Sequence, residues 1–188
     1  MQLGISLTGQ GALPPEQLTE VVQLAERCGY HSFWVPEIWG CDAVSQLAYV
    51  AARTERILLG SAIVPVYTRS AALLAMSAVS LDGLSNGRFI LGLGSSGRVV
   101  VENLHGVEFG KPLAATREVI EIVRRFVDGD RVQHSGRRFR LNGFKLSEQP
   151  RQARLPIYLA AQGMNNIALA GEIADGWLGY LQPCSTIA

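Results

Sequence analysis

Short apolar runs alternate with longer amphipathic segments along the whole chain. Strand-like runs are Leu3–Leu7, Ser32–Pro36, Ile57–Val64, Arg88–Gly92, Pro156–Ala161 and Gly176–Leu181. Between them the apolar spacing predicts helices over Pro14–Cys28, Ala43–Thr54, Ser70–Leu84, Pro112–Val127 and Asn165–Ala174, with Asp42 and Ser70 as N-caps. This regular alternation of strand and helix predicts an α/β protein with a parallel sheet.

Two segments depart from the alternation. Ser95–Lys111 is a long connection with no regular pattern. Apolar and polar residues alternate over Arg131–Leu146 around a Ser135-Gly136 turn, which predicts a small hairpin inserted before the next strand. The length of 188 residues is enough for one good core, so we expect a single domain over residues 1–188.

The placement of glycines chooses between two parallel architectures, an open doubly wound sheet and a βα barrel. In a dinucleotide-binding sheet the glycine fingerprint follows the first strand. Here Gly9 and Gly11 lead instead into Pro14-Pro15, which does not fit that fingerprint. Glycines cluster after the fourth strand, in the segment Gly92–Gly97. This pattern favours a barrel whose site lies at the carboxyl ends of the strands.

Composition excludes several classes of function. Hydrophobic residues make up 48% of the chain, charged residues 18%, and the net charge is +1, so nothing favours nucleic acid or a membrane surface as partner. No apolar run reaches the length of a membrane span, and the N-terminus lacks the basic region of a signal peptide. Cys28, Cys41 and Cys184 show neither metal-ligand nor disulfide spacing, which indicates a reduced, cytoplasmic protein without a metal site. We expect Cys28 to be a small core residue.

Five segments together resemble the luciferase-like monooxygenase superfamily, and within it the deazaflavin (coenzyme F420)-dependent oxidoreductases. They are Phe33-Trp34-Val35-Pro36-Glu37 with Asp42; Thr54–Gly60; Ser80–Arg88 running into Gly97; His105-Gly106 with Gly110–Leu113 and Thr116–Glu118; and Leu159–Ala161 with Gly163 and Ala170–Trp177. Their order and spacing fit over nearly the whole chain.

The resemblance implies a TIM-type (β/α)8 barrel with a flavin or deazaflavin across the rim formed by the carboxyl ends of the strands. A complete barrel takes about 250 residues, so we expect only about six of the eight βα units here. The chain is then either a fragment or a naturally shortened barrel. An open barrel exposes strand edges and apolar interior surface, so we expect a naturally short protein of this kind to form a homodimer or to be poorly soluble.

Glu37 is the residue we predict to be catalytic, because it follows the second strand where the family carries an acidic residue. The alternative is a carboxylate that caps a helix or forms an ion pair. In the family a histidine commonly follows and can face the reactive ring, but this chain has Ile38 there. That departure puts a general acid at this position in doubt.

Three segments are predicted to bind the cofactor. The first is Ser61, Ala62 and Ile63, where the family has a bulge with a non-proline cis peptide that aligns near Ala62-Ile63. The second is Gly94, Ser95, Ser96 and Gly97, whose backbone N–H groups and hydroxyls suit a ring edge or a phosphate-bearing tail. The third is Ala161, Gln162 and Gly163, which lead into a helix whose N-terminus suits a phosphate. Arg98 is either a partner of an anionic tail or an exposed arginine.

The remaining polar residues of the resembling segments are expected to be structural. For His105 a structural role is favoured over a catalytic one. Asp175-Gly176-Trp177 is predicted to join a helix to the sixth strand. Arg117 and Glu118 begin a helix, where ion pairing is the usual explanation.

The resemblance implies an F420-dependent oxidoreductase that transfers a hydride between the deazaflavin and a small organic substrate. Two alternatives stay open at this stage. One is an FMN-dependent monooxygenase of the same fold. The other is a flavin-binding or structural remnant without activity, which the missing barrel units and Ile38 both favour.

Overall fold

The computed structural model describes residues 2–7 and 13–180. Its main sheet is parallel and runs β1 (Gly4–Ser6), β2 (Ser32–Val35), β3 (Leu58–Ser61), β5 (Phe89–Gly94), β8 (Ile157–Ala160) and β9 (Gly176–Leu178), with the short β4 (Val64–Pro65) beside the end of β5. Neighbouring strands of this path follow one another along the chain. In a doubly wound sheet the strand order reverses, so the sequential order is that of a βα barrel.

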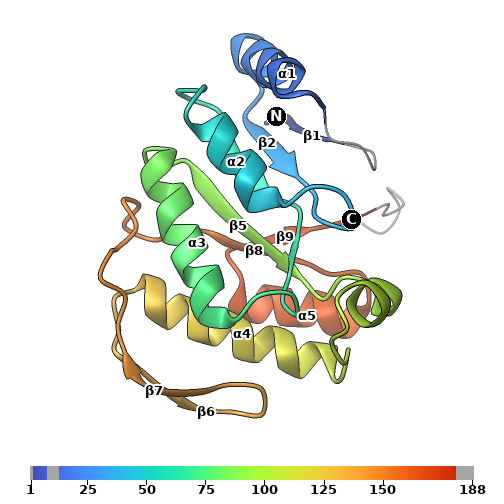
Figure 1. Cartoon of the computed structure of the whole chain (residues 1–188), viewed down its shortest axis with the longest axis vertical. Helices are drawn as coiled ribbons and strands as arrows, with labels where there is room; N and C mark the ends of the chain where they lie inside the picture. Colours follow the sequence, from blue (N-terminus) through green and yellow to red (C-terminus); the bar gives the residue numbers. More distant parts are fainter. Residues whose placement is uncertain (1, 8–12, 181–188) are drawn as a thin grey trace.

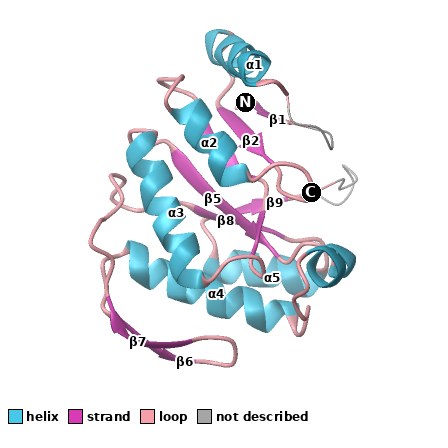
Figure 2. Cartoon of the chain, viewed as in Figure 1, coloured by secondary structure: helices cyan, strands magenta, loops and turns pink. Residues whose placement is uncertain are grey.

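Helices cover the outside of the curled sheet (Figures 1 and 2). They are α1 (Pro15–Arg27), α2 (Ala43–Ala51), α3 (Ala71–Leu84), α4 (Pro112–Val127) and α5 (Met164–Ile173). Side chains that alternate along the strands, such as Phe33, Leu59 and Leu93, are buried in the core between sheet and helices. Six consecutive βα strands with their helices on one side form the greater part of a barrel wall.

Several helices begin or end at the residues that the sequence predicted. The Asp42 carboxylate accepts the backbone N–H of Ser45 at 2.6 Å, and the Ser70 hydroxyl accepts that of Leu73 at 3.1 Å. The helix over Pro112–Val127 has the bounds that its apolar spacing predicted. The predicted hairpin is present as β6 (Val132–Ser135) and β7 (Arg140–Phe144), and Figure 1 shows it beyond α4.

Two aromatic rings occupy the inner face of the sheet. The ring centroids of Trp34 on β2 and Tyr158 on β8 lie 5.8 Å apart, across the two strands between them. Glycines make room for both rings: a Cβ at Gly60 would lie 2.2 Å from the Trp34 ring, and one at Gly176 would lie 2.7 Å from the Tyr158 ring. Any other residue at these two positions would displace a ring.

The structure differs from the sequence expectation at three places. Ile57–Val64 is not one strand, because the chain leaves the sheet after β3 through a cis peptide bond between Ala62 and Ile63 and returns as β4. The connection Ser95–Lys111 contains a π-helix, η1 (Val100–Leu104). Cys28 is exposed rather than in the core, because α1 ends at Arg27 and Cys28 is its C-cap. Within residues 2–7 and 13–180 no helix has the length and apolar character needed to cross a membrane.

Candidate functional site

The three predicted cofactor-binding segments meet at the carboxyl ends of neighbouring strands. A Cβ built at Gly94, the last residue of β5, would lie 3.1 Å from the Ile63 side chain and 3.3 Å from the Ala160 Cβ. Residues from the ends of β3, β5 and β8 therefore converge on one point. In parallel β/α proteins this edge is where ligand sites are built; cofactor binding by the three segments stays a prediction.

The Ser61 hydroxyl is not free to bind a ligand. It donates to the Gly92 carbonyl and accepts the Gly92 N–H, both at 2.9 Å, and the residue is buried. Its role is to join β3 to β5 where the regular pairing stops. Ala62 and Ile63 are half-buried at the adjoining bend, and the cis bond between them lies where the resemblance placed it.

The loop Ser95–Gly97 follows β5 and is half-open to solvent. Ser96 adopts a positive φ of 58°, and Gly97 is exposed with open space where a Cβ would stand. The Ser95 hydroxyl has only a long contact of 3.4 Å, to the Ser96 carbonyl. Arg98 comes next, and its guanidinium lies 3.2 Å from Glu102 one turn later. The loop therefore presents backbone and hydroxyl groups at the site.

The third segment leads into α5. Gly163 is the N-cap of this helix and provides no side-chain cap, while its carbonyl accepts the N–H groups of Asn166 and Ile167 at 2.8 and 3.0 Å. Ala161 is buried, and its carbonyl accepts the indole N–H of Trp177 at 2.8 Å, whereas Gln162 and Gly163 are exposed. The helix N-terminus and its positive dipole end thus face the same edge of the sheet.

Glu37 forms a bidentate ion pair with Arg69 rather than standing free at the rim. Its two carboxylate oxygens accept from the Arg69 guanidinium at 2.5 and 2.9 Å, and one also accepts the Ala43 N–H at 3.0 Å. Arg69 also reaches Asp42. Partial burial opposes it, but hydrogen bonds from Ser45 and the charge of Arg69 lower the pKa of Asp42. This geometry favours the capping and ion-pairing alternative; the catalytic role of Glu37 stays a prediction.

Sequence reasoning missed Arg69 and several exposed apolar side chains that follow the strands. Arg69 pairs with a residue 32 positions earlier, so no local spacing signals it. Ile38 and Trp39 after β2, Val99 after β5 and Met164 after β8 are all exposed apolar side chains. They come from three separate loops at the same end of the sheet. Exposed apolar side chains of this kind suit contact with a flat organic ring.

The other polar residues of the resembling segments have structural partners. Arg117 forms an ion pair with Glu172 of α5, at 2.5 Å. Glu118 accepts from the hairpin backbone, and although burial opposes it, these bonds lower its pKa. Asp175 accepts the Ile157 N–H at 2.9 Å. His105 is exposed and ends η1.

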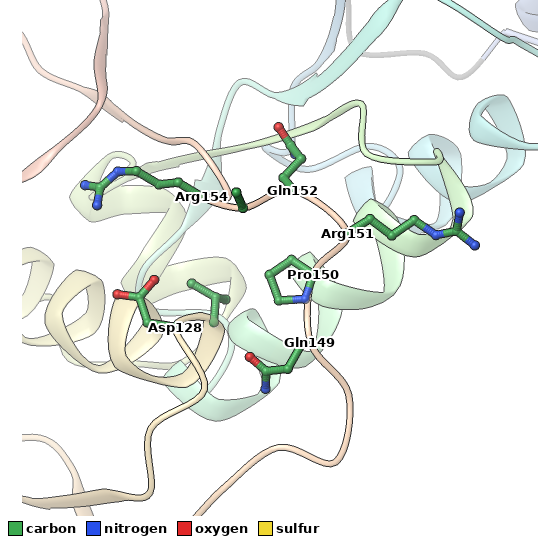
Figure 3. Close-up of a pocket in the computed structure, with 8 residues that line it drawn as sticks. Asp128, Gln149, Pro150, Arg151, Gln152 and Arg154 are labelled. Atoms are coloured by element: carbon green, nitrogen blue, oxygen red, sulfur yellow. The ribbon is translucent and has the colours of Figure 1, made fainter.

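The opposite end of the sheet holds a cavity of about 560 Å³ that is not a promising active site (Figure 3). It is lined by the segment Gln149–Arg154 with Val127 and Asp128. Arg151 and Arg154 point to opposite sides in Figure 3 and bind Asn86 and Asp175, and the Gln152 amide binds Asp82. These polar groups already have partners, and this end of a barrel serves stability.

The fold is that of a βα-barrel protein, and the candidate site lies at the carboxyl ends of β3, β5 and β8. The chain belongs to the luciferase-like monooxygenase family, which matches residues 1–188. It is 42% identical, over 95% of its length, to the "Putative coenzyme F420-dependent oxidoreductase" of Mycobacterium tuberculosis. It is 36% identical, over 86% of its length, to the 5,10-methylenetetrahydromethanopterin reductase of Archaeoglobus fulgidus.

A solved structure gives the same picture of the fold. The coenzyme F420-dependent tetrahydromethanopterin reductase of Methanopyrus kandleri superposes with a TM-score of 0.85 at 25% identity, over 95% of this chain and 55% of that one. The chain covers 55% and 48% of the two curated relatives above. It therefore spans about half the length of the proteins it matches, in agreement with the expected incomplete barrel.

Proposed function

We propose that this protein is an F420-dependent oxidoreductase that transfers a hydride between the deazaflavin and a small organic substrate. The observation that carries the proposal is the convergence of Ile63, Gly94 and Ala160 at one edge of the sheet. The relatives named as F420-dependent support the choice of cofactor.

The residues present fit such a cofactor. A flat ring needs a smooth floor, and Gly94 with Ile63 and Ala160 offers one without protruding polar groups. A phosphate needs N–H donors, and the start of α5 supplies them without a competing side-chain cap. Gly97 and Gly163 have open space where a Cβ would stand, so the backbone can approach a ligand closely at both places.

The chain's own residues bind, orient and shield. Backbone N–H groups at α5 hold the phosphate, and the Ser95–Gly97 loop fixes the ring edge. Ile38 and Trp39 exclude water from one side. Glu37 positions these two side chains, because its ion pair with Arg69 and its hydrogen bond from Ala43 connect the loop after β2 to the loop after β4. When bound, the deazaflavin supplies a ring carbon that gives or takes a hydride.

The direct test is hydride transfer with the purified chain and reduced or oxidised F420, followed by the deazaflavin absorbance over a panel of small alcohols, aldehydes and imines. Substrate-dependent bleaching or recovery supports the proposal. If the chain consumes oxygen with reduced FMN and shows no activity with F420, the protein is the FMN-dependent monooxygenase of the alternative. Saturable binding without turnover of any substrate would favour the inactive remnant.

We also propose a homodimer and a cytoplasmic location. The support for the dimer is a stripe on α3, where Leu73, Met76 and Leu84 are 46%, 52% and 57% exposed on a helix whose other faces are buried. The support for the location is that Cys28 and Cys41 are free thiols.

A further inference from the structure

Two adjacent side chains each carry a buried polar atom without a hydrogen-bond partner in the described part of the chain. The atoms are the Tyr67 phenol oxygen and Nε of Arg138. Tyr67 is 4% exposed, and its ring lies 4.5 Å from the Arg138 guanidinium carbon. Buried polar groups almost always have hydrogen-bond partners, so two unpartnered polar atoms in adjacent side chains require a physical explanation.

Aromatic stacking and a second arginine complete the surroundings. Phe109 stacks on Tyr67 with centroids 5.2 Å apart, and the Arg98 guanidinium carbon lies 5.3 Å from the centre of the Phe109 ring. Acidic groups nearby are already occupied. Glu102 pairs with Arg98 and accepts the Phe109 N–H, and Glu118 accepts the backbone N–H of Arg138.

The Arg138 guanidinium forms no ion pair with a carboxylate of residues 2–7 and 13–180, although the Glu118 carboxylate accepts its backbone N–H. Other arginines of the protein do: Arg69, Arg117 and Arg124 each pair with a carboxylate. Burial raises the pKa of the Tyr67 phenol, against the charges of Arg138 and Arg98, so the hydroxyl stays protonated and can donate. Tyr67 and Arg138 therefore offer unpartnered donors and a positive charge.

Tyr67 lies beside the predicted cofactor loop. The Val66 N–H donates to the Gly94 carbonyl at 2.9 Å, so the residue before Tyr67 is bonded to the last residue of β5. The hairpin delivers Arg138 to this place, because Glu118 on α4 accepts the N–H groups of Arg138 and Phe139 at 3.1 and 3.0 Å. This gives the inserted hairpin a role beyond covering α4.

We propose that Tyr67 and Arg138 form a binding site for an oxyanion, a phosphate or carboxylate group. Guanidinium groups bind such anions with charge-assisted hydrogen bonds, and the phenol adds a further donor. The site includes no residue of the segment that leads into α5. Its occupant is either a free or substrate anion or the acidic tail of the cofactor; only the second source rests on the proposed function.

The test is the thermal unfolding midpoint of the 188-residue chain in increasing inorganic phosphate, with ionic strength held constant by sodium chloride. A ligand that binds the folded state raises the midpoint. We expect phosphate to raise it, and Tyr67→Phe and Arg138→Gln each to weaken the phosphate dependence about tenfold or more. Arg137→Gln is the matched control, because Arg137 is the exposed neighbour on the same hairpin.

The stability of the variants without phosphate shows whether a weaker phosphate effect comes from a damaged fold. Tyr67→Phe removes an unpaired hydroxyl and keeps the ring, so the variant should be as stable as the parent chain in chloride alone. Three results would overturn the proposal. The first is a Tyr67→Phe variant that is less stable than the parent chain in chloride. The others are no effect of phosphate on the parent chain, or the same phosphate effect in the parent chain and both variants.

A second experiment separates the two sources of the anion. Arg138→Gln is titrated with intact F420 and with the same deazaflavin lacking the phosphate and acidic tail. If the acidic tail of the cofactor occupies the site, Arg138→Gln should bind intact F420 about tenfold more weakly than the parent chain does, and should bind the shortened deazaflavin equally well. A separate anion predicts unchanged binding of both deazaflavins and weaker phosphate binding. Equal loss for both deazaflavins would indicate general damage and overturn the site. Absence of any deazaflavin binding contradicts the proposed function and leaves the phosphate test standing.

Discussion

The Ser61 hydroxyl and the Gly92 backbone exchange two hydrogen bonds, each 2.9 Å long, at the point where β3 leaves the sheet. Regular pairing of β3 with β5 covers only Leu59 with Phe89 and Gly60 with Ile90. Beyond it, one side chain satisfies both backbone groups of Gly92. The approach requires glycine, because a Cβ at Gly92 would lie 1.8 Å from the Ser61 carbonyl oxygen.

Replacing Ser61 by Ala should therefore destabilise the fold. The change leaves a buried N–H and a buried carbonyl of Gly92 without their partner, and we expect a loss of about 2 to 4 kcal/mol in the free energy of unfolding. Urea unfolding measures it. Ser80→Ala on the exposed side of α3 is the control. A loss no larger than that of the control would mean that the hydroxyl has no structural role.

Gly97→Ala should separate binding from stability. An added Cβ meets nothing within 4 Å, so the free energy of unfolding should change by less than about 1 kcal/mol. The new methyl group would stand where the cofactor approaches the backbone, and we expect cofactor affinity to fall about tenfold or more. Cofactor fluorescence measures the affinity.

The control for this prediction is Gly171→Ala in α5, where an added Cβ also meets open space. Alanine is favoured over glycine in a helix, so this variant should gain about 0.5 to 1 kcal/mol of stability and bind cofactor as the parent chain does. Equal affinity in Gly97→Ala and Gly171→Ala would remove the Ser95–Gly97 loop from the site.

The Glu37 and Arg69 side chains should be energetically coupled. They are 10% and 13% exposed, so removing either takes the bidentate partner from a largely buried charge, which leaves Arg69 with Asp42 alone or Glu37 with the Ala43 N–H alone. A double-mutant cycle with Glu37→Gln and Arg69→Gln should give a coupling energy of about 1 to 3 kcal/mol in unfolding.

Activity distinguishes positioning from catalysis. Positioning predicts that Arg69→Gln impairs turnover about as much as Glu37→Gln, whereas exposed Glu108→Gln has no effect. A catalytic Glu37 would instead give a loss of kcat that Arg69→Gln does not reproduce. Comparison of kcat and KM for the three variants decides between the two roles.

Asp175 should contribute to the pH dependence of stability. Burial opposes it, but bonds from the Ile157 N–H, Arg154 and Arg124 lower its pKa below the ordinary 3.8. A lowered folded-state pKa gives stability that is present above the unfolded value and lost as pH falls through the folded value. Asp175→Asn should therefore be less stable at neutral pH, with a difference that shrinks below about pH 4. A difference that stays constant down to pH 2 would contradict this, and exposed Asp130→Asn is the control.

The exposed stripe of α3 predicts a change in assembly. Met76→Glu introduces a charge into the middle of the stripe and should convert the proposed dimer to a monomer without loss of helix content. Light scattering measures the mass, and Gln17→Glu on the exposed side of α1 is the control. A monomeric parent chain would reject the dimer.

Elements whose signals are local could be predicted from the sequence. Ser70 caps α3 through a bond three residues away, and the apolar spacing of Pro112–Val127 set both ends of α4. Relationships between distant segments could not. Arg138 lies 71 positions after Tyr67 and reaches it only because the hairpin bends back over α4. The break of Ile57–Val64 was foreseen only through the family resemblance, because apolar residues continue across it.

The most direct measurement of the central claim is a titration of the purified chain with F420 and with FMN, followed by cofactor fluorescence, in the parent chain and in Gly97→Ala. The account predicts saturable binding of F420 in preference to FMN, weakened in Gly97→Ala. Binding of neither cofactor by the folded chain, or equal binding by parent chain and variant, would contradict a cofactor site at the ends of β3, β5 and β8.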